Sequence, residues 1–527
     1  MLNVAVDECG SGPANRVQSQ TDSMVPPMTR STSALLSISR AEQQRGRTAI
    51  IDAERSFTYD ELLDRSARVA SALLRRGEEL HEERVAFLVT PGFSWAAVLW
   101  GIWRAGGVAV PFPLGSPAPE LEYLMDDTGA ETIIFDAGAE STLSPLARKR
   151  ELRTMSVADA LSSAHTTLPR VDSGRRAMIL YTSGTTSRPK GVVSTHDNIN
   201  AQITTLERAW EWNDDDRILL CLPLHHVHGI INVVSCALWS GATCEMLPRF
   251  DVAAVLQHIA SGRLTLFMAV PTVYTKLIAA WEAASPEYRR EISAGCSRMR
   301  LMVSGSAALP VATLERWKEI SGHTLLERYG MTEIGMALSN PLHGTRVPGS
   351  VGVPLPSVDV QLVSEAGDVV EAGAAGEIEV RGPSVFKEYW GKQNATRVAF
   401  RNGWFRTGDT ALVENGFYRI LGRTSIDIIK TGGHKVSALE IEEILREHDS
   451  IADCAVVGVP DAEWGERVAG ALVLRLGSSL DLEGLRLWAK ERLAAHKIPS
   501  RLLTLDELPR NAMGKVTKPV IAKLFSD

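Results

Sequence analysis

The residues richest in chemistry lie at positions 181–191, where the sequence reads YTSGTTSRPKG directly after an apolar stretch. Gly184 allows the backbone to approach a polyphosphate closely, and Lys190 supplies a positive charge. Hydroxyl groups that can donate hydrogen bonds to phosphate oxygens come from Thr182, Ser183, Thr185 and Thr186. Because the Walker spacing GxxxxGK(S/T) is absent, the segment predicts a phosphate-binding loop of a different kind, and a Ser/Thr-rich surface turn is the alternative.

Two other places carry oxygen atoms that suit ATP. Thr332 and Glu333 are adjacent at the end of the segment ERYGMTE, and a hydroxyl beside a carboxylate is the kind of hard oxygen pair that Mg²⁺ prefers. Asp409 ends the segment GWFRTGD, where a carboxylate on a turn can accept hydrogen bonds from both hydroxyls of a ribose. An ordinary turn aspartate is the alternative for Asp409 when it is taken alone.

The composition restricts the classes of function. A chain of 527 residues is too long for one ordinary domain, so two or more cores are expected. Hydrophobic residues make up 45% and charged residues 23%, as in globular proteins and unlike integral membrane or disordered ones. The formal net charge of −7 lacks the basic excess of a nucleic-acid binder. We therefore expect no nucleic-acid partner and no membrane span, and the scattered cysteines, without a CxxC pair, indicate neither a disulfide framework nor a zinc site.

Short apolar runs alternate with helical patterns from about residue 48 onward, which predicts an α/β fold with large, mostly parallel sheets. After about residue 349 the pattern changes to short β runs separated by Gly, Asp and Asn, which predicts a β-rich subdomain. Residues 422–527 are expected to form a small α+β domain. The predicted organisation is a disordered leader (1–30), a large N-terminal domain (31–421) that carries these candidate nucleotide-binding residues, and a C-terminal domain (422–527).

The first thirty residues lack hydrophobic periodicity and the apolar core of a secretory signal, so a cytoplasmic protein is expected. Residues 31–40 contain several Ser and Arg residues, as transit peptides do, which leaves the mitochondrial matrix as the alternative. The acidic residues Asp7, Glu8 and Asp22 count against import.

Five ordered segments, 181–191, 327–333, 403–409, 422–433 and 509–515, resemble the motifs of the adenylate-forming superfamily of acyl-CoA synthetases, adenylation domains and luciferases. Within that superfamily, segments 225–229, 267–277, 301–307, 330–336 and 381–390 are most similar to malonyl-CoA synthetases. The resemblance implies an ATP-dependent carboxylate–CoA ligase. It would activate malonate or methylmalonate as an acyl-AMP and transfer the acyl group to coenzyme A, giving malonyl-CoA, AMP and pyrophosphate.

The resemblance also assigns roles to residues. Lys515, Glu333 and Thr332 would be catalytic, with Glu333 holding Mg²⁺, and Gly432 and Gly433 would line the path of CoA. A second group of residues would bind ATP or AMP: Thr182, Ser183, Gly184, Thr185, Thr186, Lys190, Ser304, Gly305, Ser306, Arg328, Tyr329, Gly330, Met331, Thr332, Asp409 and Arg423. Rotation of the C-terminal domain about residues 422–427 would exchange Lys515 for Gly433 between the two half-reactions. The partners implied are a small carboxylate, ATP and CoA, in a monomer or homodimer.

The acyl substrate is expected to contact His226, Lys276, Arg300 and Ser304. A dicarboxylate needs a partner for its second charge, which Lys276 or Arg300 could provide. Ordinary surface charges are the alternative for both residues, and a satisfied core histidine is the alternative for His226.

Two alternative functions remain: a synthetase for a short or medium monocarboxylic acid, and an adenylation enzyme that loads a carrier protein. The sequence departs from the superfamily pattern at Ser187, where the loop usually has glycine, and at Ser425 and Ile426, where acidic residues are common.

Overall fold

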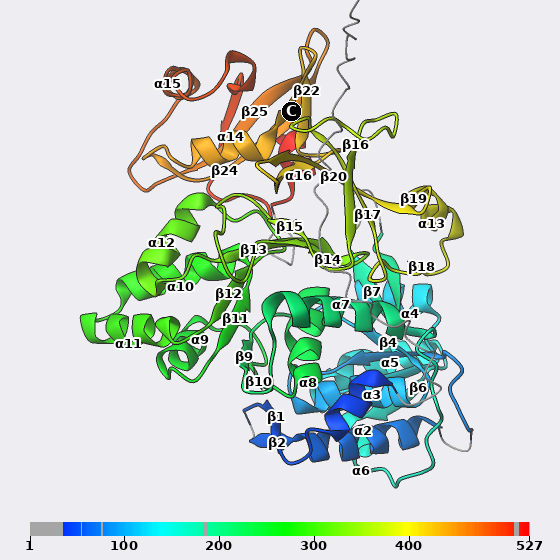
Figure 1. Cartoon of the computed structure of the whole chain (residues 1–527). Helices are drawn as coiled ribbons and strands as arrows, with labels where there is room; N and C mark the ends of the chain where they lie inside the picture. Colours follow the sequence, from blue (N-terminus) through cyan, green and yellow to red (C-terminus); the bar gives the residue numbers. More distant parts are fainter. Residues whose placement is uncertain (1–34, 54, 75–76, 183–187, 511–515, 526–527) are drawn as a thin grey trace, which may run out of the picture.

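The computed structural model describes residues 35–53, 55–74, 77–182, 188–510 and 516–525. The predicted leader, residues 1–30, lies outside them. Two large sheets, a smaller β-rich sheet and a C-terminal α+β unit are arranged as Figure 1 shows, with the C-terminal unit in orange and red. The predicted α/β class with mostly parallel sheets is confirmed.

The first large sheet has a parallel centre and antiparallel edges. Parallel pairing joins β13, β12, β11, β9, β10 and β1, while β2, β14 and β15 pair in antiparallel fashion. Its strand order is β15 (Val353–Pro354), β14 (Gly335–Ser339), β13 (Leu326–Met331), β12 (Leu301–Ser304), β11 (Leu266–Ala269), β9 (Arg217–Leu220), β10 (Thr243–Met246), β1 (Thr48–Ile51) and β2 (Ser56–Thr58).

The second large sheet has the same character, with parallel pairing from β7 through β4, β3 and β5 to β6. An antiparallel hairpin, β7–β8, brings the two ends of the predicted phosphate loop together, with Thr182 paired to Lys190. Its strand order is β18 (Glu388–Tyr389), β8 (Lys190–Thr195), β7 (Arg176–Thr182), β4 (Val108–Pro111), β3 (Arg84–Leu88), β5 (Thr132–Phe135) and β6 (Arg153–Ser156).

Helices cover both faces of each large sheet, and the central parallel strands are mostly apolar as a result. On β11, Leu266 and Met268 enter one core and Phe267 and Ala269 enter another, as side chains alternate along a strand. Helices of the core between the two sheets are α1 (Leu36–Glu42), α2 (Tyr59–Leu74), α3 (Phe93–Arg104), α7 (His196–Trp210), the π-helix η2 (His228–Ser235) and α8 (Cys236–Ser240). Helices of the outer core of the first sheet are α9 (Val252–Ala260), α10 (Pro271–Ala283), α11 (Pro286–Ser297) and α12 (Val311–Ser321).

The remaining helices of the N-terminal part connect strands of the second sheet along the chain or lie beside that sheet. They are α4 (Ala118–Thr128), the 3₁₀ turn η1 (Ala137–Ala139), α5 (Glu140–Lys149), α6 (Val157–Ser162) and α13 (Gln393–Ala399). No described helix is both long and apolar enough to span a bilayer.

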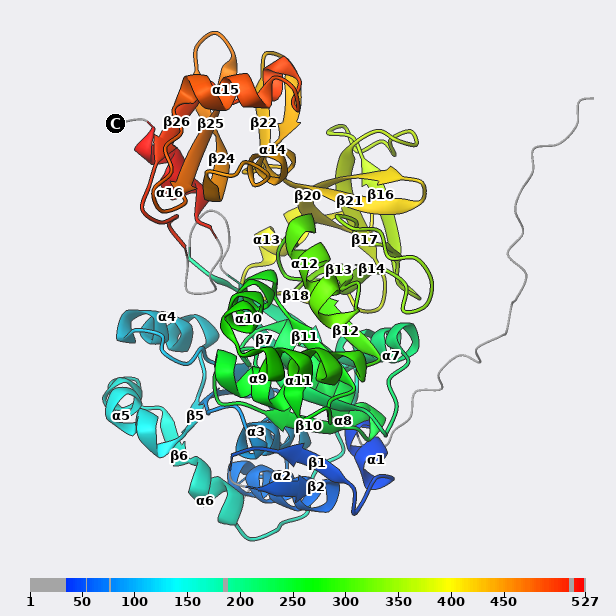
Figure 2. The same cartoon turned by 90° about the vertical axis from the view of Figure 1, so that its left-hand side faces the viewer.

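The smaller β-rich sheet lies beneath the C-terminal unit in both views (Figures 1 and 2). Its strands are β16 (Asp359–Val363), β17 (Gly376–Arg381), β20 (Trp404–Glu414), β19 (Phe400–Arg401) and β21 (Phe417–Arg423). The next strand of the chain, β22, begins at Ile428 and belongs to a different sheet. The predicted hinge, residues 422–427, therefore lies where the chain passes from one sheet to the other.

The C-terminal unit is a five-stranded sheet with helices. Its elements are β22 (Ile428–Thr431), β23 (His434–Ser437), α14 (Ala438–Leu445), β24 (Ile451–Asp461), β25 (Gly465–Leu474), α15 (Leu482–Ala489), the 3₁₀ turn η3 (Ala495–Lys497), β26 (Arg501–Thr504) and α16 (Lys518–Leu524). The sequence pattern predicts a helix over 482–495, but α15 ends at Ala489, because the chain then turns to bring Leu493 and Ile498 into the core of this unit.

Candidate functional site

The predicted site residues of the first sheet lie at the carboxyl ends of its parallel strands, where α/β proteins bind ligands. His226 follows β9, Ser304 ends β12, and Thr332 and Glu333 follow β13. Adjacent strands hold these ends side by side, since Ala269 pairs with Ser304 and Ser304 pairs with Glu327. The topology thus brings together residues separated by more than one hundred positions in the sequence.

Glu333 has the environment expected of a carboxylate that binds a cation. It is 5% exposed, and Tyr389 donates a hydrogen bond of 2.9 Å to its Oε1 atom. Oε2 is buried and has no hydrogen-bond partner among the described residues. Burial raises the pKa of Glu333 above its usual range, against the bond from Tyr389. A buried oxygen without a partner is costly, so this site fits a Mg²⁺ ion that arrives with the phosphates of ATP.

Asp409 on β20 is held by two neighbours. Arg423, its cross-strand partner on β21, places Nε 3.0 Å from Oδ1, and Tyr329 donates a hydrogen bond of 2.6 Å to Oδ2. Arg423 is fixed in turn by donating to the carbonyl of Thr407 at 2.8 Å. These contacts fix the orientation of the carboxylate of Asp409, whose binding of a ribose stays a prediction.

The phosphate loop is described only at its ends. Thr182 ends β7 and Lys190 begins β8, and the Nζ atom of Lys190 lies 5.1 Å from the ring centroid of Tyr389. Tyr389 thus contacts both Lys190 and Glu333, which places the cation of the loop near the candidate metal ligand. Four predicted loop residues, Ser183, Gly184, Thr185 and Thr186, lie outside the described residues, as do Ser187 and the predicted catalytic Lys515.

Arg328 on β13 is a buried cation. It is 3% exposed, and its closest polar contact is a long one of 3.4 Å from a guanidinium nitrogen to Ser306 Oγ. Its Nε atom is buried without a hydrogen-bond partner, and no carboxylate pairs with it among the described residues. Burial lowers the pKa of Arg328 to about 9, so it stays charged at neutral pH. Gly305 makes room for this guanidinium, because a Cβ atom there would lie 2.6 Å from Arg328 Cζ.

Other buried polar groups lie at the same end of the sheet as Arg328. Ser304 Oγ and His228 Nε2 are buried and unpaired within the described part of the chain. Ser306 adopts a left-handed backbone conformation with φ of 70° and places its hydroxyl 3.3 Å from His228 Nδ1. Burial and the charge of Arg328 hold the pKa of His228 well below its usual value, so this ring is neutral. The predicted acyl residue His226 stacks on His225, with ring centroids 4.1 Å apart, at the same end of the sheet.

The two predicted partners of a distal carboxylate lie elsewhere. Arg300 precedes β12, at the opposite end from Ser304, and donates from Nε to Oδ1 of buried Asp216 at 2.8 Å. It also donates to the carbonyl of Trp210 at 2.7 Å. The expectation that Arg300 binds the acyl group is therefore wrong: its guanidinium is occupied by a structural ion pair. Lys276 is exposed on α10, with Nζ 5.7 Å from the ring centroid of Phe250.

Gly432 and Gly433 form the turn between β22 and β23, with φ of 54° and 80°. Positive φ at both positions is typical of a tight hairpin turn and requires glycine. Trp464 covers this turn, since a Cβ atom on Gly432 would lie 2.9 Å from its ring, whereas Gly433 has open space beside it. The described contacts do not connect either glycine to Glu333, so their role toward CoA stays a prediction.

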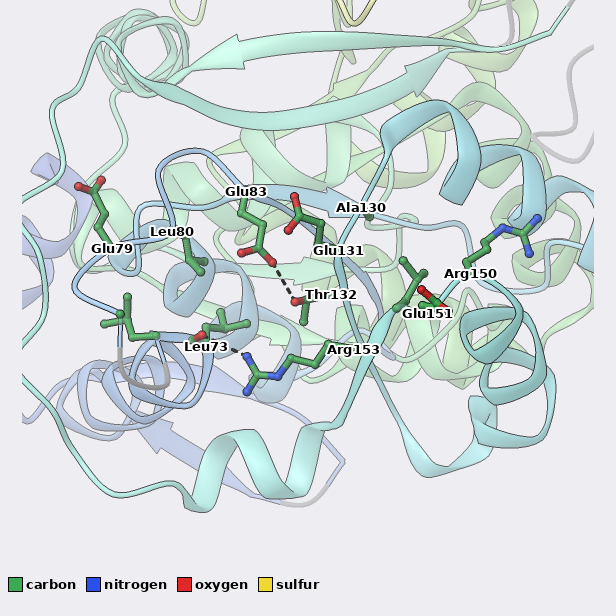
Figure 3. Close-up of a pocket in the computed structure, with 13 residues that line it drawn as sticks. Leu73, Glu79, Leu80, Glu83, Ala130, Glu131, Thr132, Arg150, Glu151 and Arg153 are labelled. Atoms are coloured by element: carbon green, nitrogen blue, oxygen red, sulfur yellow. Dashed lines mark hydrogen bonds between the residues drawn. The ribbon is translucent and has the colours of Figure 1, made fainter.

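A cavity of about 580 Å³ lies away from all of these residues (Figure 3). It borders the amino ends of β3, β5 and β6, opposite the end at which Thr182 lies. Two of its lining residues are already paired: Thr132 donates to Glu83 at 2.9 Å, and Arg153 donates to the carbonyl of Leu73 at 3.1 Å. The volume of this cavity therefore does not identify it as the site of the reaction.

Two residues of this site, Tyr389 and His228, were not predicted as site residues, although both lie in segments with family resemblance. The prediction that Arg328 binds the nucleotide stays a prediction, and its hydrogen bond is to Ser306. The sequence signal for Arg328 as a buried cation was its place in the run LLERYGM, which forms a partly buried strand.

Comparisons with known proteins agree with this geometry. A family model described as AMP-binding enzyme matches residues 39–390, and one described as AMP-binding enzyme C-terminal domain matches residues 440–515. The "Malonate--CoA ligase ACSF3, mitochondrial" of Homo sapiens is 46% identical, over 95% of this chain and 93% of the relative. The protein of the same name from Xenopus laevis is 46% identical, over 91% and 90%. The crystal structure of ATP-bound MatB from Rhodopseudomonas palustris superposes with a TM-score of 0.87 at 34% identity, covering 94% of this chain and 99% of that one.

Proposed function

The chain belongs to the AMP-binding enzyme family, and we propose that it is an ATP-dependent malonate–CoA ligase. It joins malonate to the α-phosphate of ATP with release of pyrophosphate, then transfers the malonyl group from malonyl-AMP to the thiol of CoA with release of AMP. Malonate–CoA ligase is also the printed name of the human and frog relatives. The substrates are a small carboxylate, ATP and CoA, with Mg²⁺ as the metal ion.

The buried cation Arg328 is the single observation that carries the choice of a dicarboxylate. An unpaired charge in a protein interior is expensive, and an anion that enters the site relieves that cost. When one carboxylate of malonate is activated, the other keeps its negative charge. Arg328, with the hydroxyl of Ser306 beside it, offers that charge a partner. A monocarboxylate would leave Arg328 unpaired.

The first half-reaction uses groups from both domains. Asp409 and Arg423 orient the ribose, and Lys190 supplies positive charge to the phosphates. Glu333 and Thr332 would hold Mg²⁺, which supplies charge neutralisation on the phosphates when it is bound. Lys515 is assigned to the charge that develops as the malonate carboxylate attacks the α-phosphorus and pyrophosphate leaves.

The second half-reaction requires Lys515 to give way to the thiol. We assign the hinge to residues 422–427, where the chain passes between sheets, and the CoA path to the turn at Gly432 and Gly433. Rotation of a domain about a short linker is a common form of gating in enzymes. The open space beside Gly433 suits the passage of a narrow pantetheine arm.

We also propose that the protein works in mitochondria. The human and frog relatives carry the word mitochondrial in their names. Expression of the full chain with a C-terminal fluorescent tag, followed by fractionation of the cells, tests this. Recovery in the matrix fraction supports the proposal, and recovery in the cytosol contradicts it.

The assignment of Arg328 is tested by comparing Arg328→Met with Lys276→Met. Removing one partner of a buried charge pair costs about 2–5 kcal/mol, so Arg328→Met should lower kcat/KM for malonate about 30- to 5,000-fold. The value for butyrate should change little. Lys276→Met, at an exposed position, should leave the malonate-to-butyrate ratio near that of the wild type. If Lys276→Met lowers the ratio and Arg328→Met does not, the exposed lysine binds the distal carboxylate instead.

A further inference from the structure

Asp127, near the end of helix α4, receives hydrogen bonds from two distant parts of the chain and lies beside the hydroxyl of Tyr123. Tyr181 donates to Oδ2 at 2.8 Å, Lys392 donates to Oδ1 at 2.7 Å, and Tyr123, one helical turn earlier, lies 3.3 Å from Oδ1. The carboxylate is largely enclosed, with a side-chain exposure of 15%. None of the five resemblance motifs contains Asp127 or Tyr123.

The two donors, Tyr181 and Lys392, belong to segments that carry residues of the ATP site. Tyr181 directly precedes Thr182, at the first end of the phosphate loop. Lys392 follows strand β18, and its backbone N–H donates to the carbonyl of Tyr389 at 3.0 Å. Tyr389 in turn contacts Glu333 and Lys190. One carboxylate therefore connects the loop to the segment that holds the candidate metal ligand.

Tyr123 holds the second end of the loop. Its hydroxyl donates to the carbonyl of Pro189 at 2.7 Å, directly before Lys190. Its ring packs edge-on against Tyr181, with centroids 6.3 Å apart, and the guanidinium of Arg188 lies 5.4 Å from its centroid. The side chains of Tyr123 and Asp127, four residues apart on one helix, thus contact residues on both sides of segment 183–187.

The charges of this network are balanced. Lys392 neutralises Asp127 through an ion pair of 2.7 Å, so the group does not need an external cation. Burial and the neighbouring Asp127 raise the pKa of Tyr181, so its hydroxyl keeps its proton and acts as a donor. Asp126, the residue before Asp127, does not belong to this network: its side chain is 62% exposed and pairs with Arg150 at 2.6 Å.

We propose that Asp127 and Tyr123 are positioning residues of the ATP site, which fix both ends of the phosphate loop and couple them to the segment bearing Tyr389. They touch neither substrate nor reacting atoms. This inference rests on the proposed function for its use of ATP, and it concerns only the first half-reaction. Thioester formation from a ready-made acyl-AMP releases AMP and does not involve the β- and γ-phosphates.

The test compares Asp127→Asn and Tyr123→Phe with the matched control Asp126→Asn in the full-length protein. Pyrophosphate–ATP exchange with malonate measures the first half-reaction, and malonyl-CoA formation from supplied malonyl-AMP measures the second. Because hydrogen bonds to charged groups contribute more than neutral ones, Asp127→Asn should raise KM for ATP in the exchange reaction about tenfold or more and Tyr123→Phe about threefold. Both variants should form malonyl-CoA from malonyl-AMP within about twofold of the wild-type rate, as Asp126→Asn should in both assays.

Two results would overturn the proposal. One is an Asp127→Asn exchange reaction with the same KM for ATP as Asp126→Asn. The other is an equal loss of both half-reactions in Tyr123→Phe, whose ring and packing are preserved. Failure of the proposed function can be told apart from failure of this inference, because the wild-type protein would then show no malonate-dependent pyrophosphate–ATP exchange. The variants would in that case be compared with whichever carboxylate supports exchange.

Discussion

Lys518 and Asp427 form a buried ion pair, with Nζ 2.6 Å from Oδ1, at the point where the C-terminal helix α16 meets the predicted hinge. Lys518 also pairs with Glu442 at 2.8 Å. The second oxygen of Asp427 accepts the backbone N–H of Arg423 at 2.9 Å, and the Arg423 side chain binds Asp409. A continuous set of contacts therefore connects Asp409, the carboxylate that we propose binds the ribose, with a lysine three residues beyond Lys515.

Replacing Lys518 with methionine should destabilise the C-terminal domain. The change leaves Asp427 without its cation and Glu442 with only the more distant Arg446, 3.4 Å away, and loss of one partner of a buried pair costs about 3–5 kcal/mol. Urea denaturation monitored by tryptophan fluorescence measures the effect. Lys523→Met, at an exposed position on the same helix, is the control and should change stability by less than about 0.5 kcal/mol. Equal stability of the two variants would contradict the role of this ion pair.

The same ion pair predicts a dependence on alkaline pH. Burial opposes the charge of Lys518, but Glu442 and Asp427 together raise its pKa above the ordinary value. A lysine whose pKa is higher in the folded state stabilises the fold below about pH 10.4, and this contribution is lost as the pH rises through the folded value. Lys518→Met should therefore lose less stability than the wild type above pH 10.

Glu327 predicts a loss of stability with rising pH closer to neutrality. It is 6% exposed, and burial raises its pKa to about 8, although the N–H of Gly349 donates to it at 3.0 Å. Because the folded state then binds this proton up to about pH 8 while the unfolded state releases it near pH 4.3, the free energy of unfolding should fall as the pH rises between these values. Glu327→Gln should flatten this slope and be more stable than the wild type at pH 8, by on the order of a few kcal/mol.

Chemical denaturation at pH 5, 6.5 and 8 measures the slope for Glu327→Gln. The exposed Glu315→Gln is the control and should keep the wild-type slope. A Glu327→Gln slope equal to that of the wild type would mean that Glu327 is ionised in the folded protein at neutral pH.

Lys515→Ala should separate the two half-reactions. Only the first requires positive charge at the α-phosphate, so pyrophosphate–ATP exchange should fall by about a thousandfold, the scale of a lost group that stabilises transition-state charge. Formation of malonyl-CoA from supplied malonyl-AMP should continue at close to the wild-type rate. Loss of both reactions to the same extent would contradict alternation of the C-terminal domain.

Gly433→Phe should have the reverse effect. A large side chain beside the turn would block the CoA path but leave pyrophosphate–ATP exchange intact. Gly477→Phe is a matched control, because Gly477 has a similar φ of 81°, also has open space beside it and lies in the same domain. If exchange is lost first in Gly433→Phe, the CoA path lies elsewhere.

The α/β class with mostly parallel sheets and the candidate residues of the nucleotide site could be proposed from the sequence because their signals are local. The apolar strand before Thr182 and the adjacent pair Thr332 and Glu333 need no knowledge of distant residues. The partner of the distal carboxylate could not be predicted in this way. Arg300 and Arg328 both adjoin buried strands, but only the fold shows that Asp216 pairs with Arg300, whereas Arg328 has no such partner among the described residues.

The proposed malonate–CoA ligase activity is tested most directly by identifying the product that the purified full-length protein forms from ATP, Mg²⁺, CoA and a single carboxylate. With malonate we expect malonyl-CoA, identified by mass, together with an equal amount of AMP. With butyrate, kcat/KM should be lower by about 30-fold or more, because Arg328 then lacks its anionic partner. A higher kcat/KM for butyrate than for malonate, or formation of malonyl-AMP without malonyl-CoA, would contradict the assignment as a malonate–CoA ligase.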